Sequence, residues 1–145
     1  MDIINQTEDI NVNVSLIFEL INDVNQYSEF LPWCSESKIL DDNNSEMTAE
    51  IEIHRSPIKW KFKTRNVYKS DEIININLQE GPFKDLKGSW KFEKIDKFNS
   101  RVTLYLEYEF NSKIIELSLK PVFSSIMSSI LDSFISEAFK RKNAK

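Results

Sequence analysis

The sequence is short of the residues that common catalytic and binding motifs require. It has two glycines, one cysteine and one histidine among 145 residues. Two glycines cannot supply a phosphate-binding loop or a dinucleotide fingerprint. The single cysteine, Cys34, cannot form an internal disulfide, and a lone thiol beside Trp33 is more often buried filler than a nucleophile. His54 falls at an outward position of an expected strand, which argues against metal or triad chemistry.

Long apolar runs are also missing. The longest uncharged stretch, residues 121–131, is broken by serines and is shorter than the ~20 apolar residues of a membrane span. Acidic residues at positions 2, 8 and 9 argue against a secretory signal or an arginine-rich transit peptide. We therefore expect a cytoplasmic protein. The length and the 41% hydrophobic content suit one domain, residues 1–145.

Charge is unevenly distributed along the chain. The overall net charge of −4 divides into −11 for residues 1–54, +6 for residues 55–101 and +1 for residues 102–145. A basic middle segment could direct the protein to phosphates or to an anionic membrane surface. The alternative is that the acidic and basic segments neutralise each other across neighbouring strands.

The first thirty residues predict a strand and then two short helices. Residues 2–9 alternate weakly, as a strand does. Asn13 can cap a helix whose apolar residues follow the i, i+3, i+4, i+7 spacing from Val14 to Ile21. A second apolar turn runs from Val24 to Leu31, and Pro32 ends it because proline cannot continue a helix interior.

From residue 36 onward the hydrophobic period changes from 3.6 to 2, which predicts an antiparallel meander with one apolar face. Residues 47–54 and 58–65 are expected to pair through a turn at Ser56-Pro57, so that Ile53 faces Trp60. The same register sets Glu52 against Lys61 and Glu50 against Lys63, as a ladder of weak ion pairs. Further alternating runs cover residues 74–79, 90–93 and 102–110.

The carboxyl-terminal segment is helical, with apolar and polar pairs repeating every four residues from Val122. At about 100° per residue this stripe winds around the helix, which suits a curved sheet. Pro121 either starts this helix or lies inside a longer one that begins near Lys113. The element order predicts an α+β helix-grip fold, in which a curved antiparallel sheet grips the long terminal helix. Such a grip tends to leave a cavity.

Both glycines lie in residues 81–92, between two strand-like runs. Gly81 and Gly88 could be hinges of a lid edged by Phe83, or Phe83 and Leu86 could plug the end of the core. Lysines 84, 87 and 91 would lie beside this loop and could contact lipid headgroups or ribosomal RNA. Three tryptophans and ten phenylalanines exceed what a small single-sheet core ordinarily needs, which favours ligand binding.

Three segments of the chain carry distinctive motifs: Tyr27-x-x-Phe30-Leu31-Pro32-Trp33-Cys34-x-x-Ser37, Gly81-Pro82-Phe83-Lys84-x-Leu86-x-Gly88-x-Trp90-x-Phe92, and the region from Phe110-Asn111 to Pro121-Val122-Phe123. Together they resemble the coenzyme Q-binding START-like family of the polyketide cyclase and lipid-transport superfamily, in the same order and over essentially the whole chain. One departure lies in the last helix, where many members have Phe-x-x-Arg-Ala and this chain has Glu137 in place of the arginine.

The resemblance implies two functions. One is non-enzymatic binding of a polyprenyl quinone such as ubiquinone, or another lipid, in support of respiration, with peripheral contact with the inner face of the membrane. The alternative is binding of the large ribosomal subunit to block subunit association, as toxins of the family do. Residues 32–34 look more like the quinone-binding branch, and residues 64–66 like the toxins.

We expect no catalytic residue, no metal, no DNA partner and no cofactor apart from the ligand. A cyclase role lacks an inward-facing acid or base. The predicted ligand contacts are Leu31, Trp33, Trp60, Phe62, Ile76, Leu78, Phe83, Leu86, Trp90, Phe92, Leu106, Tyr108, Ile126, Met127, Ile130 and Phe134.

Overall fold

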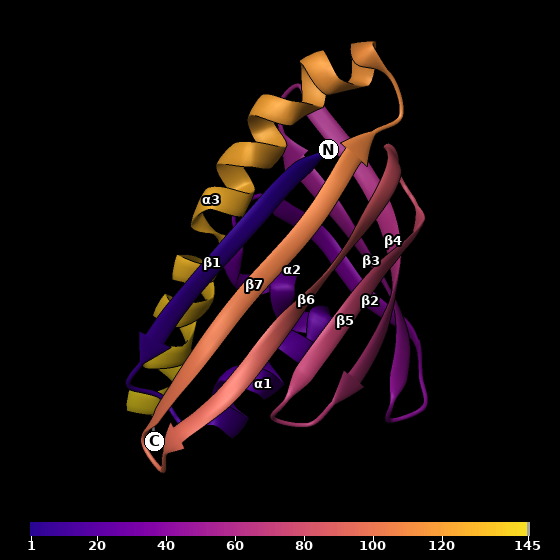
Figure 1. Ribbon diagram of the computed structural model, residues 1–145. Helices are drawn as coiled ribbons and strands as arrows, with labels where there is room; N and C mark the ends of the chain where they lie inside the picture. Colours follow the sequence, from indigo (N-terminus) through magenta and orange to yellow (C-terminus); the bar gives the residue numbers. More distant parts are fainter. Residues whose placement is uncertain (145) are drawn as a thin grey trace.

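The computed structural model describes residues 1–144 as one antiparallel sheet wrapped around a long helix (Figure 1). The sheet has seven strands in the order β1-β7-β6-β5-β4-β3-β2, so the first strand pairs with the last and the others form a meander. The elements are β1 (Asp2–Ile10), α1 (Val14–Asn22), the 3-10 turn η1 (Val24–Gln26), α2 (Tyr27–Phe30), β2 (Cys34–Asp42), β3 (Glu46–Arg55), β4 (Ile58–Lys69), β5 (Ile73–Glu80), β6 (Phe83–Asp96), β7 (Asn99–Phe110) and α3 (Lys113–Asn143).

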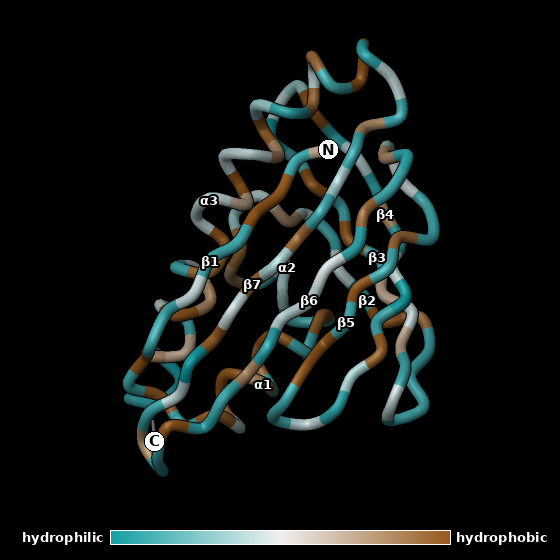
Figure 2. The backbone as a smooth tube through the Cα atoms, in the orientation of Figure 1, coloured by the Kyte–Doolittle hydropathy of each residue, from teal (hydrophilic) through white to brown (hydrophobic). Residues whose placement is uncertain are grey.

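The inner face of the sheet follows the predicted alternation. Figure 2 shows hydrophobic and hydrophilic residues alternating along β6 and β7. In β7 every second residue from Val102 to Phe110 is buried. The β3–β4 register is the predicted one, with Ile53 opposite Trp60. Because side chains in a strand point alternately to its two faces, this register places both strands' apolar residues against α3 and the short helices.

The short helices close one side of the grip. Asn13 caps α1 as expected: its side chain accepts a hydrogen bond from the Ser15 backbone N–H at 2.9 Å. Helix α1 buries Ile17, Phe18 and Ile21 and contacts α3. Helix α2 ends at Phe30, before Pro32, so that the chain enters β2 at Cys34.

The structure shows the longer of the two helices predicted for the carboxyl-terminal segment. Helix α3 begins at Lys113 and contains Pro121. Ser112 caps it by accepting a hydrogen bond from the Ile115 backbone N–H at 3.2 Å. Figure 1 shows α3 running along the sheet from one end of the molecule to the other. Its buried residues are Leu119, Phe123, Ile126, Met127, Ile130, Leu131, Phe134 and Ala138.

By length and composition alone, α3 would also be long and apolar enough to cross a membrane. About a third of its most apolar stretch, 33%, is buried inside the fold. Its buried side chains belong to the core that it shares with the sheet, as expected for the central helix of a grip.

The predicted ion-pair ladder needs a correction. Glu52 and Lys61 are opposite each other, as are Glu50 and Lys63, but these residues do not pair directly. Lys61 instead approaches Glu36 on β2 at 3.2 Å, and Lys63 approaches Glu80 on β5 at 3.5 Å. Strand alternation places these long side chains on one face of the sheet. The nearer carboxylates, however, come from β2 and β5, the strands on either side of the β3–β4 pair.

The proposed glycine hinge also needs a correction, because Gly88 lies inside β6. It pairs with Leu106 on β7 and with Ile76 on β5. The connection between β5 and β6 is only Gly81-Pro82. A residue held by ladders on both sides cannot act as a loop hinge.

Candidate functional site

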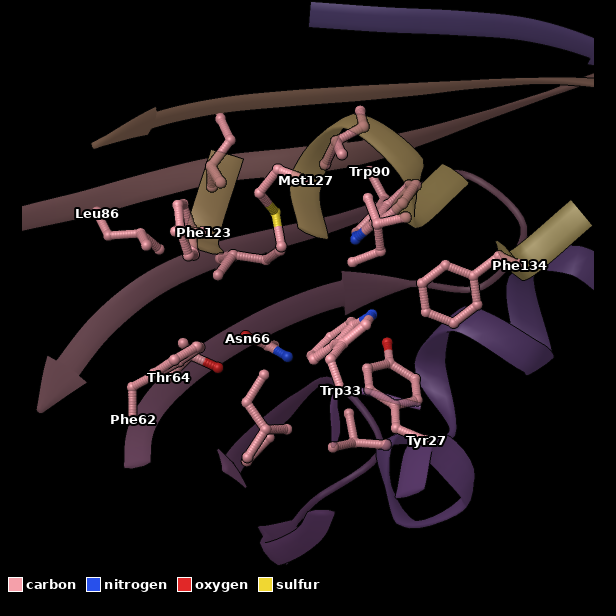
Figure 3. Close-up of a pocket in the computed structure, with 17 residues that line it drawn as sticks. Tyr27, Trp33, Phe62, Thr64, Asn66, Leu86, Trp90, Phe123, Met127 and Phe134 are labelled. Atoms are coloured by element: carbon pink, nitrogen blue, oxygen red, sulfur yellow. The ribbon is translucent and has the colours of Figure 1, made fainter. Parts of the chain in front are cut away.

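A cavity of about 110 Å³ lies between the inner face of the sheet, α3 and the turn that precedes β2 (Figure 3). Its walls combine side chains from five strands, β3 to β7, with others from α3 and residues 24–33. The lining residues are Val24, Tyr27, Trp33, Ala49, Ile51, Phe62, Thr64, Asn66, Ile76, Leu86, Trp90, Leu104, Leu106, Phe123, Met127, Ile130 and Phe134.

Many of the predicted ligand contacts line this cavity. These are Trp33, Phe62, Ile76, Leu86, Trp90, Leu106, Met127, Ile130 and Phe134. The other predicted contacts, Leu31, Trp60, Leu78, Phe83, Phe92, Tyr108 and Ile126, lie outside the lining but pack in or against the same hydrophobic core.

Phe83 lies where it can plug the end of the core. It is buried and packs its ring against Phe62, Tyr108, Phe110 and Phe123, with centroid separations of 4.9 to 6.1 Å. Nearby, Lys84 pairs with Glu109 at 3.5 Å and Lys87 with Glu107 at 3.9 Å. These two lysines are therefore partly neutralised across the β6–β7 ladder.

Several lining residues were not among the predicted contacts, and two of these are polar. Thr64 and Asn66 have the same strand parity as Phe62 and so face inward. The sequence contains a signal for both residues, because inward parity in a strand applies to polar as well as to apolar side chains. The complete set that was missed is Val24, Tyr27, Ala49, Ile51, Thr64, Asn66, Leu104 and Phe123.

Burial keeps two titratable groups neutral, one in the turn before β2 and one at the start of β2. Burial raises the pKa of the Tyr27 hydroxyl, which donates a hydrogen bond to the Ile21 carbonyl. Burial also raises the pKa of the Cys34 thiol to about 11, and that thiol contacts the Glu36 carbonyl at 3.3 Å. Cys34 is therefore a protonated core residue at neutral pH and not a nucleophile.

The cavity wall contains no charged residue among those described. Across residues 1–144, no three His, Cys, Asp or Glu side chains are grouped so as to hold a metal ion. His54 is exposed at the end of β3. The arrangement can enclose an apolar molecule and offer it a few uncharged polar groups, and it presents no acid–base pair to that molecule.

A curved seven-stranded antiparallel sheet around a long terminal helix defines a START-type helix-grip protein. A START superfamily protein from Mycobacterium smegmatis superposes with a TM-score of 0.79 at 14% identity, covering 95% of this chain and 97% of that one. An aromatase/cyclase from Streptomyces sp. R1128 superposes with a TM-score of 0.80 at 14% identity, covering 97% and 94%. At these identities the likeness establishes the fold alone.

The sequence establishes the family. Residues 10–135 match the family described as polyketide cyclase / dehydrase and lipid transport, and the chain belongs to it. The ribosome association toxin RatA of Escherichia coli is 35% identical over 131 residues, 90% of this chain and 83% of RatA. The mitochondrial coenzyme Q-binding protein COQ10 of Dictyostelium discoideum is 27% identical over 132 residues, 88% of this chain and 64% of COQ10.

Proposed function

We propose that this protein binds a polyprenyl quinone or a similar lipid in its internal cavity, as a carrier or chaperone without catalytic activity. The main support for this proposal is the cavity itself, which lies between the sheet and the helix and has an almost entirely apolar, aromatic-rich wall. Small-molecule sites have this character: apolar walls with a few polar groups. A relative named for coenzyme Q binding and a family described as lipid transport support the choice of ligand.

The energetics suit reversible binding. Each buried methylene contributes about 0.8 kcal/mol, so a tail of about ten methylene groups would contribute ~8 kcal/mol before the costs of association. The cavity of about 110 Å³ is smaller than the roughly 300–1,000 Å³ of a typical ligand site. A tail must therefore displace side chains, and Met127 suits this role because its unbranched thioether repacks easily.

The absence of an acid–base pair in the described wall supports a binding function. Cyclisation needs proton transfer at the substrate, and the Tyr27 hydroxyl in the described wall is already engaged, because it donates a hydrogen bond to the Ile21 carbonyl.

The proposal can be tested by extraction and native mass spectrometry of the purified protein, followed by reconstitution with ubiquinone. We expect a one-to-one complex. Met127→Trp should fill the cavity and prevent the complex, whereas Ser128→Trp, at the next and exposed position of α3, should leave it intact. Thermal melting would confirm that both variants fold. Failure of the unmodified protein to take up quinone after reconstitution would overturn the proposal.

We propose association with the large ribosomal subunit as the second candidate function, because relatives at about 35% identity are named for ribosome association. The basic end of α3, residues 140–142, is the surface we assign to it. Within that cluster Arg141 pairs with Glu137 at 3.1 Å and the Lys142 ammonium contacts the Asn11 carbonyl at 2.7 Å, while Lys140 is exposed.

Sedimentation through a sucrose gradient at low salt tests this second function. We expect the protein in the large-subunit fraction, and we expect Lys140→Glu to reduce that fraction. Recovery of all the protein at the top of the gradient would exclude ribosome association. Both functions place the protein in the cytoplasm, and the first also requires it to exchange its ligand with a membrane surface.

A further inference from the structure

The cavity holds a buried amide that has no partner for its oxygen. Asn66 is 7% exposed, and its Oδ1 atom makes no hydrogen bond within the described residues. It lies on β4 between Met47 of β3 and Ile76 of β5, and Figure 3 shows its amide among the lining side chains. Buried polar groups in folded proteins are nearly always paired, so an unpaired one in a cavity wall indicates a missing partner.

Two further polar groups are directed into the same space. Trp33 and Trp90 are each 4% exposed, and both line the cavity. Figure 3 shows their indole nitrogens facing the space between the two rings. No hydrogen bond from either indole N–H to another described residue is present. An indole N–H is a donor only, so a ligand would meet these two groups with acceptor atoms.

The described wall offers nothing to a charged headgroup. None of its side chains is ionised, and the Tyr27 hydroxyl already donates to Ile21. An anionic carboxylate or phosphate would therefore be buried without a counter-charge, which is strongly unfavourable. A neutral oxygen-bearing group meets no such penalty. The Asn66 amide can donate to a carbonyl or accept from a hydroxyl, so it suits either form of a quinone or quinol oxygen.

The size of the cavity limits how much of a ligand it encloses. A dry engineered cavity of about 150 Å³ accommodates benzene. The volume here, about 110 Å³, therefore corresponds to roughly one ring and not to a long tail. The existing cavity carries the polar groups, so the ring-bearing end of the ligand belongs there, and the tail occupies the space that opens when side chains such as Met127 move.

Building on the proposed function, we propose that the ligand binds with its neutral, oxygen-bearing ring innermost, held by Asn66 and by the indole N–H groups of Trp33 and Trp90. This arrangement selects neutral oxygenated rings over anionic lipids and over plain hydrocarbons. The three side chains come from β4, β6 and the end of the turn before β2, and the fold brings them to one cavity.

Three probes that share a hexyl chain separate the possibilities: hexyl-1,4-benzoquinone, hexylbenzene and heptanoate carry a neutral quinone ring, a hydrocarbon ring and a carboxylate, respectively. Binding is followed by ¹H–¹⁵N spectra of the three indole groups. Trp60 is the internal control, because it lies on β4 but does not line the cavity. We expect the quinone to bind most tightly and to move the Trp33 and Trp90 indole signals downfield, while the Trp60 signal stays in place.

The outcomes distinguish the headgroup assignment from the broader proposal that the cavity binds an apolar ligand. If hexylbenzene or heptanoate binds as tightly as the quinone, or if the Trp33 and Trp90 signals do not move, the headgroup assignment is overturned and the apolar cavity function stands. If none of the probes binds, and ubiquinone does not bind either, both are overturned.

A variant at Asn66 provides the second test. Asn66→Leu keeps the approximate volume and removes the amide, so we expect quinone affinity to fall about tenfold, the effect of one hydrogen bond, with hexylbenzene affinity unchanged. Asn75→Ala, at an exposed position of β5, is the matched control and should change neither affinity. Equal affinities of the Asn66→Leu variant and the unmodified protein for the quinone would contradict the assignment.

Discussion

Gly88 of β6 lies directly opposite Leu106 of β7, at a point where the two strands leave no room for a β-carbon. A methyl group on Gly88 would come within 2.1 Å of the Tyr105 carbonyl oxygen and 2.9 Å of the Leu106 Cα. Real β-carbons do not approach backbone this closely. Gly88 is therefore required by strand packing next to the cavity, since Leu106 and Ile76 on its two neighbouring strands both line it.

We predict that Gly88→Ala destabilises the protein by about 3 kcal/mol or more, at the upper end for overpacking, because the backbone itself must move. Urea unfolding followed by circular dichroism measures this. Gly81→Ala is the comparison. Its new β-carbon would meet the Phe62 Cβ at 2.8 Å and the φ of +159° adds strain, but the nearest backbone atom, the Phe62 Cα, is 3.7 Å away, so we expect a smaller loss. A smaller loss for Gly88→Ala than for Gly81→Ala would contradict the packing explanation.

Asn66 is predicted to reduce stability in the ligand-free protein. Its buried, unpaired Oδ1 carries a desolvation penalty, so Asn66→Leu should raise the free energy of unfolding by about 1–2 kcal/mol. The same substitution is expected to weaken quinone binding, so stability and affinity should change in opposite directions. Thermal and urea unfolding without ligand provide the measurement, and a loss of stability in this variant would show that the amide has a structural role.

Arg65 joins three strands on the outer face. Its guanidinium lies 2.7 Å from Glu46, 3.1 Å from Asp41 and 2.7 Å from the buried Thr48 hydroxyl. We expect Arg65→Met to reduce the free energy of unfolding, since charge-assisted hydrogen bonds are lost and Thr48 is left without its donor.

The control for Arg65 is Lys69→Met. Lys69 pairs with Glu72, three residues away, and its side chain is 75% exposed, so we expect a smaller loss than for Arg65→Met. Urea unfolding at low and at high salt compares the two variants. Equal effects of the two substitutions would contradict the role assigned to Arg65.

The pH dependence of stability is predicted to include a contribution from Cys34. The pKa of this thiol is about 11 in the folded protein against 9.0 for an unperturbed thiol. Because the folded-state value is raised, the unfolded chain loses its proton first, and stability falls as pH rises from about 9 to about 11. Burial also raises the pKa of Tyr27, and that of Tyr68 to about 12, so these two tyrosines add to the fall above pH 10.

Cys34→Ala should flatten the part of this fall between pH 9 and 10, as measured by urea unfolding at a series of pH values. The native thiol should also resist maleimide at neutral pH and react once the protein is unfolded. Rapid labelling of the native protein at pH 7 would show that the thiol is accessible and ionised, contrary to the structure.

Local features of the fold were predictable from the sequence. The Asn13 cap depends on the first turn of α1 alone, and the pairing of Ile53 with Trp60 depends on a short turn and a period of two. Ion-pair partners were less predictable. Lys61 reaches Glu36 because β2 returns to lie beside β3, and no pattern within β3 and β4 contains that information.

The sequence by itself determined which face of each strand is apolar, where α1 begins and that a terminal helix must cover the sheet, because these depend on periodicity and capping. Tertiary structure alone decided which inward residues enclose empty space. Phe83 and Tyr108 have the predicted inward parity yet fill an aromatic cluster, whereas Asn66, polar and overlooked, lines the cavity. Parity assigns a side chain to a face, but its depth against α3 depends on how the curved sheet and the helix diverge. Gly88, for which the sequence left a lid hinge and a plugged strand connection open, is a close contact between strands.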